Sequence, residues 1–262
     1  MSVAANMESG TLARPDLCGQ VAFIANGSEP VGSAIARRLA SNGATVGLCG
    51  DDRRGLDALA AEIVANGGKA LIVAPDRSGL AGIPEIGESI RSKLGNVHIL
   101  VNNPPELAGS SLAELSVADF AENVSSTLTS SFALLREFVP IMRAHKYGRI
   151  VNVFSLAYLG VPGRIDVAAA YAGIFGLTRS AALETARDGI TANSVVRGDI
   201  VAPNQLPDDI AKIVAAIPVK RIGAVEDVVH AIRYLVSPTT SYVTGQTLFV
   251  CGGRSVYFSF SV

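Results

Sequence analysis

Short apolar runs alternate with longer amphipathic stretches along most of this chain. Seven runs have the length and composition of strands, at residues 21–25, 45–49, 70–73, 99–102, 150–154, 191–195 and 247–250. The stretches between them predict helices at residues 31–41, 56–65, 83–94, 117–143, 166–187 and 226–236. Several of the runs are apolar on both faces, which is typical of parallel strands covered by helices. The alternation predicts an α/β fold: one doubly wound domain with a seven-stranded parallel sheet flanked by helices on both faces.

The chain carries no linker, internal repeat or low-complexity segment, so we expect one domain. We assign residues 1–18 to an N-terminal extension, residues 19–253 to the domain and residues 254–262 to a C-terminal tail. Residues 199–218 contain three prolines and interrupt the alternation, which predicts a flap on the substrate side. Such a flap would cover the carboxyl edge of the sheet, where open α/β folds bind ligands. The tail is aromatic and is expected at a subunit interface.

Charge and hydropathy exclude several classes of partner. The net charge is −1 without any basic run, so we expect neither nucleic acid nor an anionic membrane surface as a partner. Mean hydropathy is +0.37, yet no apolar stretch approaches the roughly 18 residues that span a bilayer. The cysteines Cys18, Cys49 and Cys251 are far apart, and we interpret them as core residues in a reducing cytoplasm. Their spacing predicts no metal site, and the first residues do not resemble a signal peptide.

Five short motifs carry a resemblance to a known family. They are Val-Asn-Asn at 101–103, Gly-Arg-Ile-Val-Asn at 148–152, Ala-Gly-Ile-Phe-Gly-Leu-Thr at 172–178, Arg-Ile-Gly at 221–223 followed by Glu-Asp-Val at 226–228, and Tyr-Val-Thr-Gly-Gln-Thr-Leu at 242–248 before two glycines. In this order and spacing, residues 19–253 resemble short-chain dehydrogenases/reductases over the full length of that family. The resemblance implies a Rossmann fold, whereas function has to be argued from the site.

The cofactor loop departs from the family pattern. Members of the family bind pyrophosphate with Thr-Gly-x-x-x-Gly-x-Gly, but residues 25–32 read Ala-Asn-Gly-Ser-Glu-Pro-Val-Gly. Gly32 is kept, in the role that permits close packing of helix on strand. Pro30 removes an N–H donor, and Glu29 adds negative charge beside the expected phosphates. We expect weakened or absent pyrophosphate binding, although Gly27 could take over the turn by a shift of one residue.

Other positions of the resemblance retain traces of a nucleotide site. Asp51 stands where a ribose hydroxyl would bind, and with Asp52 it would repel the phosphate of NADP, which makes NAD the less excluded cofactor. The same two residues are equally well explained as a helix cap. Asp76 matches the aspartate that faces adenine, and Asn102 begins the Asn-Asn motif, which continues here with two prolines. Arg197-Gly198 replaces the usual Pro-Gly after the sixth strand. We therefore regard Gly32, Asp51, Asp76 and Asn102 as vestigial and predict that this chain binds no cofactor.

The catalytic positions are also changed. In the family, a tyrosine exchanges the proton, a lysine lowers its pKa, a serine holds the carbonyl and an asparagine binds water. The motif at 172–178 places Val167 at the tyrosine position and Tyr171 at the lysine position, and Thr127 takes the asparagine position. Only Ser155 is retained. Tyr171 could be a relocated acid, but a structurally packed tyrosine is the simpler interpretation. His98, His145 and His230 are scattered and predict neither a metal site nor a catalytic triad.

These changes predict a catalytically silent subunit. It would pair with an active paralogue in a dimer or tetramer, as in heteromeric hydroxyacyl-CoA dehydrogenases of the family, and NAD would bind to that paralogue. The small residues at 167–170 are expected to form a helix face for subunit packing. The first alternative is a non-redox enzyme, such as a lyase, cyclase or dehalogenase, which reuses the cofactor pocket through Ser155 and Tyr171. The second alternative is an NAD-dependent oxidoreductase with a displaced catalytic residue.

Overall fold

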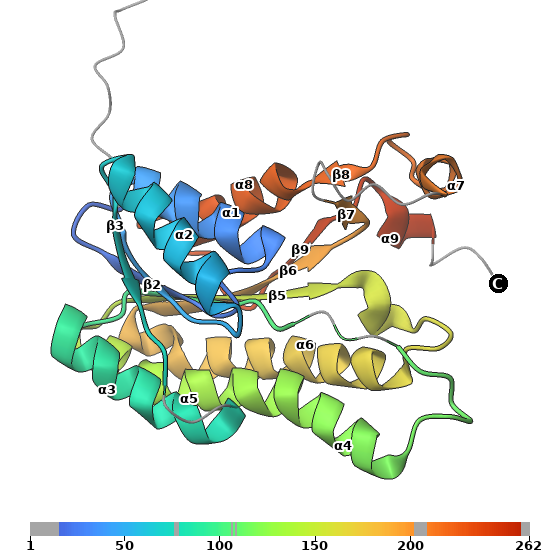
Figure 1. Ribbon diagram of the computed structural model, residues 1–262, viewed down its shortest axis with the longest axis horizontal. Helices are drawn as coiled ribbons and strands as arrows, with labels where there is room; N and C mark the ends of the chain where they lie inside the picture. Colours follow the sequence, from blue (N-terminus) through green and yellow to red (C-terminus); the bar gives the residue numbers. More distant parts are fainter. Residues whose placement is uncertain (1–15, 76–78, 106, 108, 202–208, 258–262) are drawn as a thin grey trace, which may run out of the picture.

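The computed structural model describes residues 16–75, 79–105, 107, 109–201 and 209–257. Seven parallel strands form one sheet in the order β3-β2-β1-β4-β5-β6-β9 (Figure 1). The strands are β1 (Val21–Ile24), β2 (Thr45–Leu48), β3 (Lys69–Ile72), β4 (Ile99–Asn102), β5 (Gly148–Ser155), β6 (Ile190–Arg197) and β9 (Thr247–Val250). The predicted fold class is therefore confirmed. Two short strands, β7 (Ile200–Val201) and β8 (Gly223–Ala224), pair separately.

Helices cover both faces of this sheet, as Figure 1 shows. On one face lie α1 (Pro30–Ser41), α2 (Arg53–Ala65) and α8 (Val225–Val236). On the other face lie α3 (Ile83–Leu94), α4 (Val117–Val124), α5 (Ser130–Ala144) and α6 (Ile165–Thr185). Two shorter helices, α7 (Ile210–Ala216) and α9 (Arg254–Tyr257), lie beyond the carboxyl ends of the strands.

The core consists of two apolar layers that the sheet separates. Because side chains of a strand alternate between faces, Ile24 packs among residues of α1, α2 and α8, whereas Phe23 packs among residues of α3 and α5. The ring of Phe23 lies 5.1 Å from that of Phe138 on α5. Burial of each such side chain contributes about 1.5–3 kcal/mol relative to the exposed state. Because the strands carry apolar side chains on both faces, helices are needed on both faces of the sheet to bury them.

The long helix predicted for residues 117–143 is interrupted. A π-helical turn, η2 (Ser125–Thr129), separates α4 from α5, and Pro140 lies inside α5. The prediction of one continuous helix missed this turn, in which the backbone bonds run from residue i to i+5. π-turns often occur at functional sites, and this one contains Thr127 at the predicted asparagine position.

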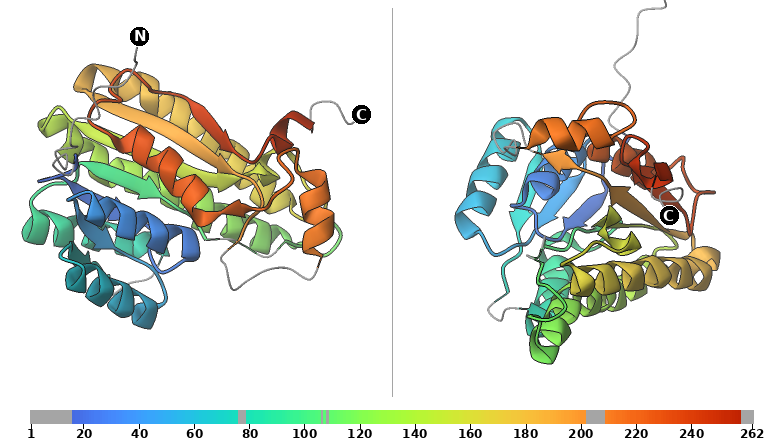
Figure 2. Two further views of the ribbon diagram at one scale, coloured as in Figure 1. Left: turned by 90° about the horizontal axis from the view of Figure 1, so that it is seen from above. Right: turned by 90° about the vertical axis from the view of Figure 1, so that its right-hand side faces the viewer.

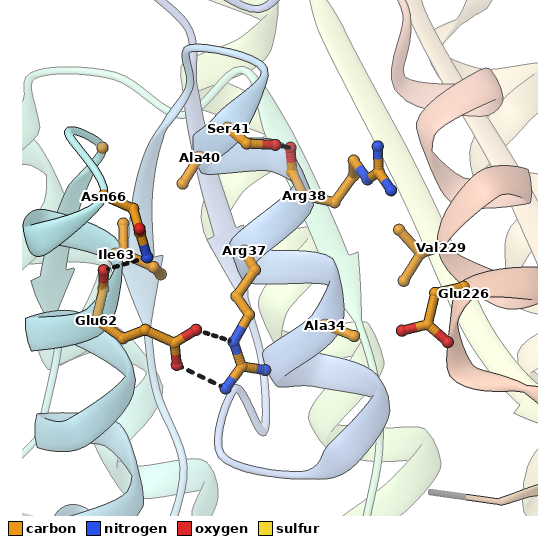
Figure 3. A pocket seen from close by; sticks show the side chains of 11 residues that line it. Ala34, Arg37, Arg38, Ala40, Ser41, Glu62, Ile63, Asn66, Glu226 and Val229 are labelled. Carbon is orange, nitrogen blue, oxygen red and sulfur yellow. Dashed lines mark hydrogen bonds and ion pairs between the residues drawn. The ribbon is translucent and has the colours of Figure 1, made fainter. Parts of the chain in front are cut away.

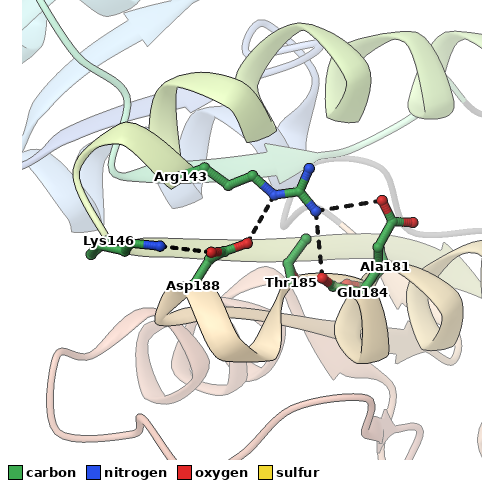
Figure 4. A network of polar contacts seen from close by, with 6 residues as sticks. All are labelled: Arg143, Lys146, Ala181, Glu184, Thr185 and Asp188. Atoms are coloured by element: carbon green, nitrogen blue, oxygen red, sulfur yellow. Dashed lines mark hydrogen bonds and ion pairs between the residues drawn. The ribbon is translucent and has the colours of Figure 1, made fainter.

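A polar network fastens the end of α5 to the end of α6 (Figure 4). Asp188, in the short 3₁₀ segment η4 (Ala186–Asp188), accepts a bond of 2.9 Å from Nζ of Lys146 and another of 2.9 Å from Nε of Arg143. The hydrogen bond from Lys146, together with that from Arg143, lowers the pKa of Asp188. The network lies where α5 leads into the amino end of β5, away from the carboxyl edge of the sheet, which favours a structural role.

Three expectations about individual residues need correction. Cys18 is exposed rather than a core residue, because it lies in a turn before β1. Leu17 was assigned to the extension, yet it is 1% exposed and packs in the core, so the folded unit includes it. Residues 167–170 do not form one outward face: Val167 and Ala170 are buried within the chain, Ala168 is half-buried, and only Ala169 is exposed. A four-residue run covers a full helical turn, so its members point in different directions.

Residues 202–208 of the predicted flap and residues 258–262 of the tail lie outside the described residues.

Candidate functional site

The carboxyl ends of β1, β4, β5 and β6 meet at one edge of the sheet, which faces the viewer in the right-hand panel of Figure 2. The loops that follow these strands hold most of the positions that the sequence singled out. The loop after β1 joins α1, and the loop after β5 leads through a short 3₁₀ segment, η3 (Leu156–Leu159), to α6. This edge is the place where a doubly wound fold offers a binding crevice.

Hydrogen bonds to two neighbouring loops hold the loop after β1 in place. Asn26 adopts a positive φ of 50°, and its Nδ2 donates a bond of 2.7 Å to the carbonyl oxygen of Asn103 after β4. The amide of Gly27 donates to the carbonyl of Cys49 at 2.8 Å. Glu29 is the exposed N-cap of α1, and Pro30 is its first residue. This end of α1 therefore presents a carboxylate, and its first residue has no N–H to donate, which is a poor arrangement for a pyrophosphate.

Gly32 permits a close approach between α1 and this loop. A Cβ at Gly32 would lie 2.2 Å from the carbonyl oxygen of Asn26, so a side chain does not fit there. The contact corresponds to the packing role predicted for this glycine.

The acidic pair after β2 acts at a helix end. Asp52 is the N-cap of α2, and its carboxylate accepts a bond of 3.0 Å from the amide of Gly55, which confirms the capping interpretation for Asp52. Asp51 is exposed beside it. In the preceding loop, burial raises the pKa of the Cys49 thiol to about 11, so this thiol stays protonated at neutral pH. Asp76 and its neighbour Arg77 lie outside the described residues.

Asn102 belongs to a buried polar chain that crosses three strands. Its Nδ2 donates to Oδ1 of Asn152 at 2.7 Å, and Nδ2 of Asn152 donates to Oγ1 of Thr178 at 2.8 Å. Ser194 on β6 donates to the same Thr178 oxygen at 2.9 Å. These contacts tie β4, β5 and β6 to α6. A structural role therefore accounts for Asn102.

The two positions that carry the catalytic pair in the family are buried in an apolar cluster. Val167 and Tyr171 are each 2% exposed, and they pack with Phe154, Ile174 and Val196. The ring of Tyr171 lies 5.9 Å from the ring of Phe154. Valine carries no exchangeable proton, and the ring of Tyr171 is buried in this apolar cluster. The structurally packed interpretation of Tyr171 therefore fits its environment better than the acid interpretation.

A second aromatic hydroxyl lies near this cluster. Tyr158 in η3 stacks on Phe175 with the ring centroids 6.1 Å apart, and its ring also contacts Phe154 edge-on. Burial raises the pKa of Tyr158, which makes it a weaker acid at neutral pH. A raised pKa opposes the proton exchange with a carbonyl substrate that the family tyrosine performs, so Tyr158 is poorly suited to that role.

Thr127 lies in the π-helical turn and is 1% exposed. Its carbonyl accepts a bond of 2.7 Å from the hydroxyl of Ser131. Its own hydroxyl has no hydrogen-bond partner among the residues that the structure describes. The side chain of Thr127 is shorter than that of asparagine and has no amide group, so it cannot make the same hydrogen bonds.

Ser155 ends β5 and caps η3, where its Oγ accepts a bond of 3.3 Å from the amide of Ala157. It lines a hollow of about 310 Å³ at the carboxyl edge. Three arginines line the same hollow, namely Arg164, Arg197 and Arg254. Tyr171 does not line this hollow, so the hollow differs from the pocket expected between Ser155 and Tyr171.

Sequence reasoning missed these arginines as a group. Arg197 ends β6, Arg254 lies four residues after the end of β9, and Ser155 ends β5; these three strands are neighbours in the sheet. Since the carboxyl ends of parallel strands meet at one edge, their placement could have been predicted from the strand order. Arg164, at the start of α6, could not, because the loop before it has no regular pattern.

A larger hollow of about 460 Å³ lies between α1, α2 and α8, away from the carboxyl edge (Figure 3). Its principal polar contact is the ion pair between Arg37 and Glu62, with Nε and Oε1 2.8 Å apart. The hydrogen bond from Arg37 lowers the pKa of Glu62, as expected of an exposed ion pair. This hollow is a groove between helices and contains no pair of groups suited to acid–base chemistry.

The scattered histidines remain apart in the structure. His98 Nδ1 accepts a bond of 3.0 Å from the amide of Val21, while His145 and His230 are exposed. Within the described ranges, no three residues of the types His, Cys, Asp and Glu come together as metal ligands. A search of the same ranges for a helix of sufficient length and apolarity to cross a bilayer returned none.

Comparison with known proteins places this site in a family context. A sequence profile described as enoyl-(acyl carrier protein) reductase matches residues 25–255. In Thauera aromatica, subunit BbsC of (2S)-[(R)-hydroxy(phenyl)methyl]succinyl-CoA dehydrogenase is 41% identical, over 93% of this chain and 98% of the relative. Subunit BbsD of the same dehydrogenase is 32% identical, over 91% and 97%. Among solved structures, a variant of a Serratia marcescens short-chain dehydrogenase/reductase superposes with a TM-score of 0.84 at 28% identity, covering 92% of this chain and 99% of the other.

Proposed function

The chain belongs to the short-chain dehydrogenase/reductase family, and from this premise we propose that it is a catalytically silent subunit of a hetero-oligomeric dehydrogenase. Its partner would be an active paralogue that binds NAD and oxidises a hydroxyacyl substrate, of the acyl-CoA class. The observation that carries the proposal is the apolar burial of Val167 and Tyr171 at the positions of the catalytic pair. A group without an exchangeable proton cannot serve as the general acid, whatever its surroundings.

The cofactor loop supports the same proposal. Pro30 has no N–H at the first position of α1, and the carboxylate of Glu29 stands at its N-cap. The first turn of a helix attracts anions through its N–H groups, so the missing donor and the added negative charge both oppose a pyrophosphate. Asp51 adds a further negative charge next to the site that a 2′-phosphate would take. We propose that this chain binds neither NAD nor NADP, and that NAD binds to the partner.

The relatives support a subunit role. BbsC and BbsD are subunits of one dehydrogenase, and this chain is similar to both, at 41% and 32% identity. A chain that resembles BbsC over nearly its full length would pair with a subunit that resembles BbsD. The contribution of the silent subunit would be to complete the interface and stabilise its partner.

Titration calorimetry with NADH and NADPH tests this proposal. The purified chain alone should release no binding heat, whereas the complex with an intact, co-expressed paralogue should bind one NADH per heterodimer. The isolated paralogue serves as the control, because its cofactor site should be intact but its stability reduced. Binding of NADH to the lone chain would refute the silent-subunit proposal and favour an oxidoreductase with a displaced catalytic residue.

A further inference from the structure

The hollow beside Ser155 has an unusual lining for a chain whose catalytic pair is replaced. Its charged lining residues are Arg164, Arg197, Arg254 and Asp199, so positive charge exceeds negative by two. Much of the remaining lining is apolar, from Leu156, Ala157, Val161, Ile200, Val201, Ile213 and Ile222. A volume of about 310 Å³ lies at the lower end of the range for small-molecule sites.

Backbone contacts fix the shape of this hollow. Arg197 is the register partner of Ser155 in the β5–β6 pairing, so the two residues lie side by side at the strand ends. The amide of Gly198 donates to the carbonyl of Val250 at 2.9 Å, and a Cβ at Gly198 would lie 2.8 Å from the Cα of Cys251. These close contacts hold the backbone next to Arg197 in one position.

Contacts within the chain hold the other two arginines, Arg164 and Arg254, at the hollow. Nη2 of Arg164 donates a bond of 2.6 Å to the carbonyl of Leu107. Arg254 forms an ion pair with Asp199, which keeps its side chain against the hollow. A guanidinium keeps its charge at any physiological pH, and its planar fork matches a carboxylate. The positive potential of the hollow is thus built into the fold.

We propose that this hollow binds a small organic carboxylate with an apolar body, and that Arg197 holds the carboxylate group. The arginines supply charge-assisted hydrogen bonds, while the apolar lining removes the body of the ligand from water. Inorganic phosphate would satisfy the arginines but leave the apolar lining without a partner. This inference goes beyond the proposed function, because it assigns a ligand to this chain alone and requires neither a nucleotide nor a partner subunit.

Calorimetric titration of the full chain tests the assignment with three probes: 3-phenylpropanoate, its uncharged amide and inorganic phosphate. The carboxylate should bind, and the amide should bind about tenfold more weakly or not at all, because it lacks the charge. Equal binding of acid and amide, or no binding of the acid, would overturn the proposal. Phosphate that binds as tightly as the acid would also overturn it, since the hollow would then select any oxyanion.

Variants connect this binding to the hollow. Arg197→Gln should weaken 3-phenylpropanoate binding about tenfold. Arg136→Gln makes the same chemical change on the exposed surface of α5 and should leave the affinity unchanged. Thermal melting of each variant shows whether it is folded. If Arg197→Gln does not fold, Val161→Asp places a negative charge at a residue that is 37% exposed and should weaken binding by a similar factor. Unchanged affinity in a folded variant of either kind would refute the site.

Discussion

The side-chain amide of Asn26 donates a hydrogen bond of 2.7 Å to the carbonyl oxygen of Asn103, and this bond joins the loop after β1 to the loop after β4. Asn26 also has a φ of 50°, a conformation that asparagine tolerates better than most residues. We expect Asn26→Ala to lower the free energy of unfolding by about 2 kcal/mol, from the lost bond and the strained backbone together. Asn26→Gly removes only the bond and should cost about half as much in urea unfolding. Equal losses in the two variants would contradict the contribution of the backbone.

A pair of glycine substitutions tests the contact between α1 and the same loop. A Cβ at Gly32 would lie 2.2 Å from the carbonyl oxygen of Asn26, so Gly32→Ala should lower the free energy of unfolding by about 3 kcal/mol. Gly176 lies in α6 with nothing within 4 Å of its Cβ position. Gly176→Ala should therefore stabilise the protein by about 0.5–1 kcal/mol through helix propensity. Chemical denaturation of both variants gives the comparison, and a tolerated Gly32→Ala would mean that α1 can move away from the loop.

Restoring the family lysine at residue 171 should damage the fold. Tyr171 is 2% exposed among apolar side chains, so Tyr171→Lys places an ammonium group there without a carboxylate. We expect a loss of about 3 kcal/mol in the free energy of unfolding. Tyr171→Phe keeps the ring beside Phe154 and should lose about 1 kcal/mol, the typical value of one hydrogen bond. If Tyr171→Lys were as stable as Tyr171→Phe, the cluster would have to be open to water.

Much of the fold and part of the site follow from the sequence alone. The seven strands of the main sheet lie where the apolar periodicity places them, because in a parallel sheet burial on both faces leaves a strong signal at each strand. The presence of Val167 and Tyr171 on the same helix as the motif at residues 172–178 also follows, because the sequence predicts one helix over this stretch. The capping role of Asp52 was one of two interpretations that the sequence allowed, and its bond to Gly55 confirms that role.

Other features could not be predicted because they depend on contacts distant in sequence. The π-helical turn at Thr127 is one short irregular turn between two helices, and a periodicity averaged over a long window does not resolve it. The packing of Tyr171 against Phe154 joins α6 to β5, and composition does not reveal whether such a position is open or filled. The arginine-lined hollow collects residues from the ends of separate elements. Cys18 was misassigned because a cysteine is usually buried, and the turn before β1 exposes it.

The environment of His98 predicts a pH dependence of stability. Burial, with a smaller contribution from the positive charge of His145, lowers the pKa of His98 below its usual value of 6.5. Its Nδ1 accepts a bond from the amide of Val21, which requires the neutral ring. The contribution of His98 is therefore complete above the unfolded-state pKa of about 6.5 and is lost as the pH falls through the folded-state pKa. Urea unfolding between about pH 7.5 and 5 should show this loss of stability.

Two variants isolate the contribution of His98 to that pH dependence. In His98→Gln, the side-chain oxygen can still accept from Val21 but does not titrate, so the slope of stability against pH should decrease. His230→Gln removes an exposed histidine and should leave the slope unchanged. An unchanged slope in His98→Gln would assign the effect to other groups.

The proposed pairing with a paralogue predicts which surface is needed. Leu183 on α6 is 85% exposed and Phe132 on α5 is 50% exposed, on helices that cover the same face of the sheet. Exposed apolar residues of this size favour burial against another subunit. Leu183→Glu should weaken association with the paralogue about thirtyfold, the loss typical of a central interface residue.

Val64→Glu changes a residue that is 57% exposed on α2, over the other face of the sheet, and should leave association unchanged. Light scattering of the mixed subunits measures both effects. Association that survives Leu183→Glu would move the interface away from α6, and the exposed Phe249 on the edge strand β9 would become the next residue to change.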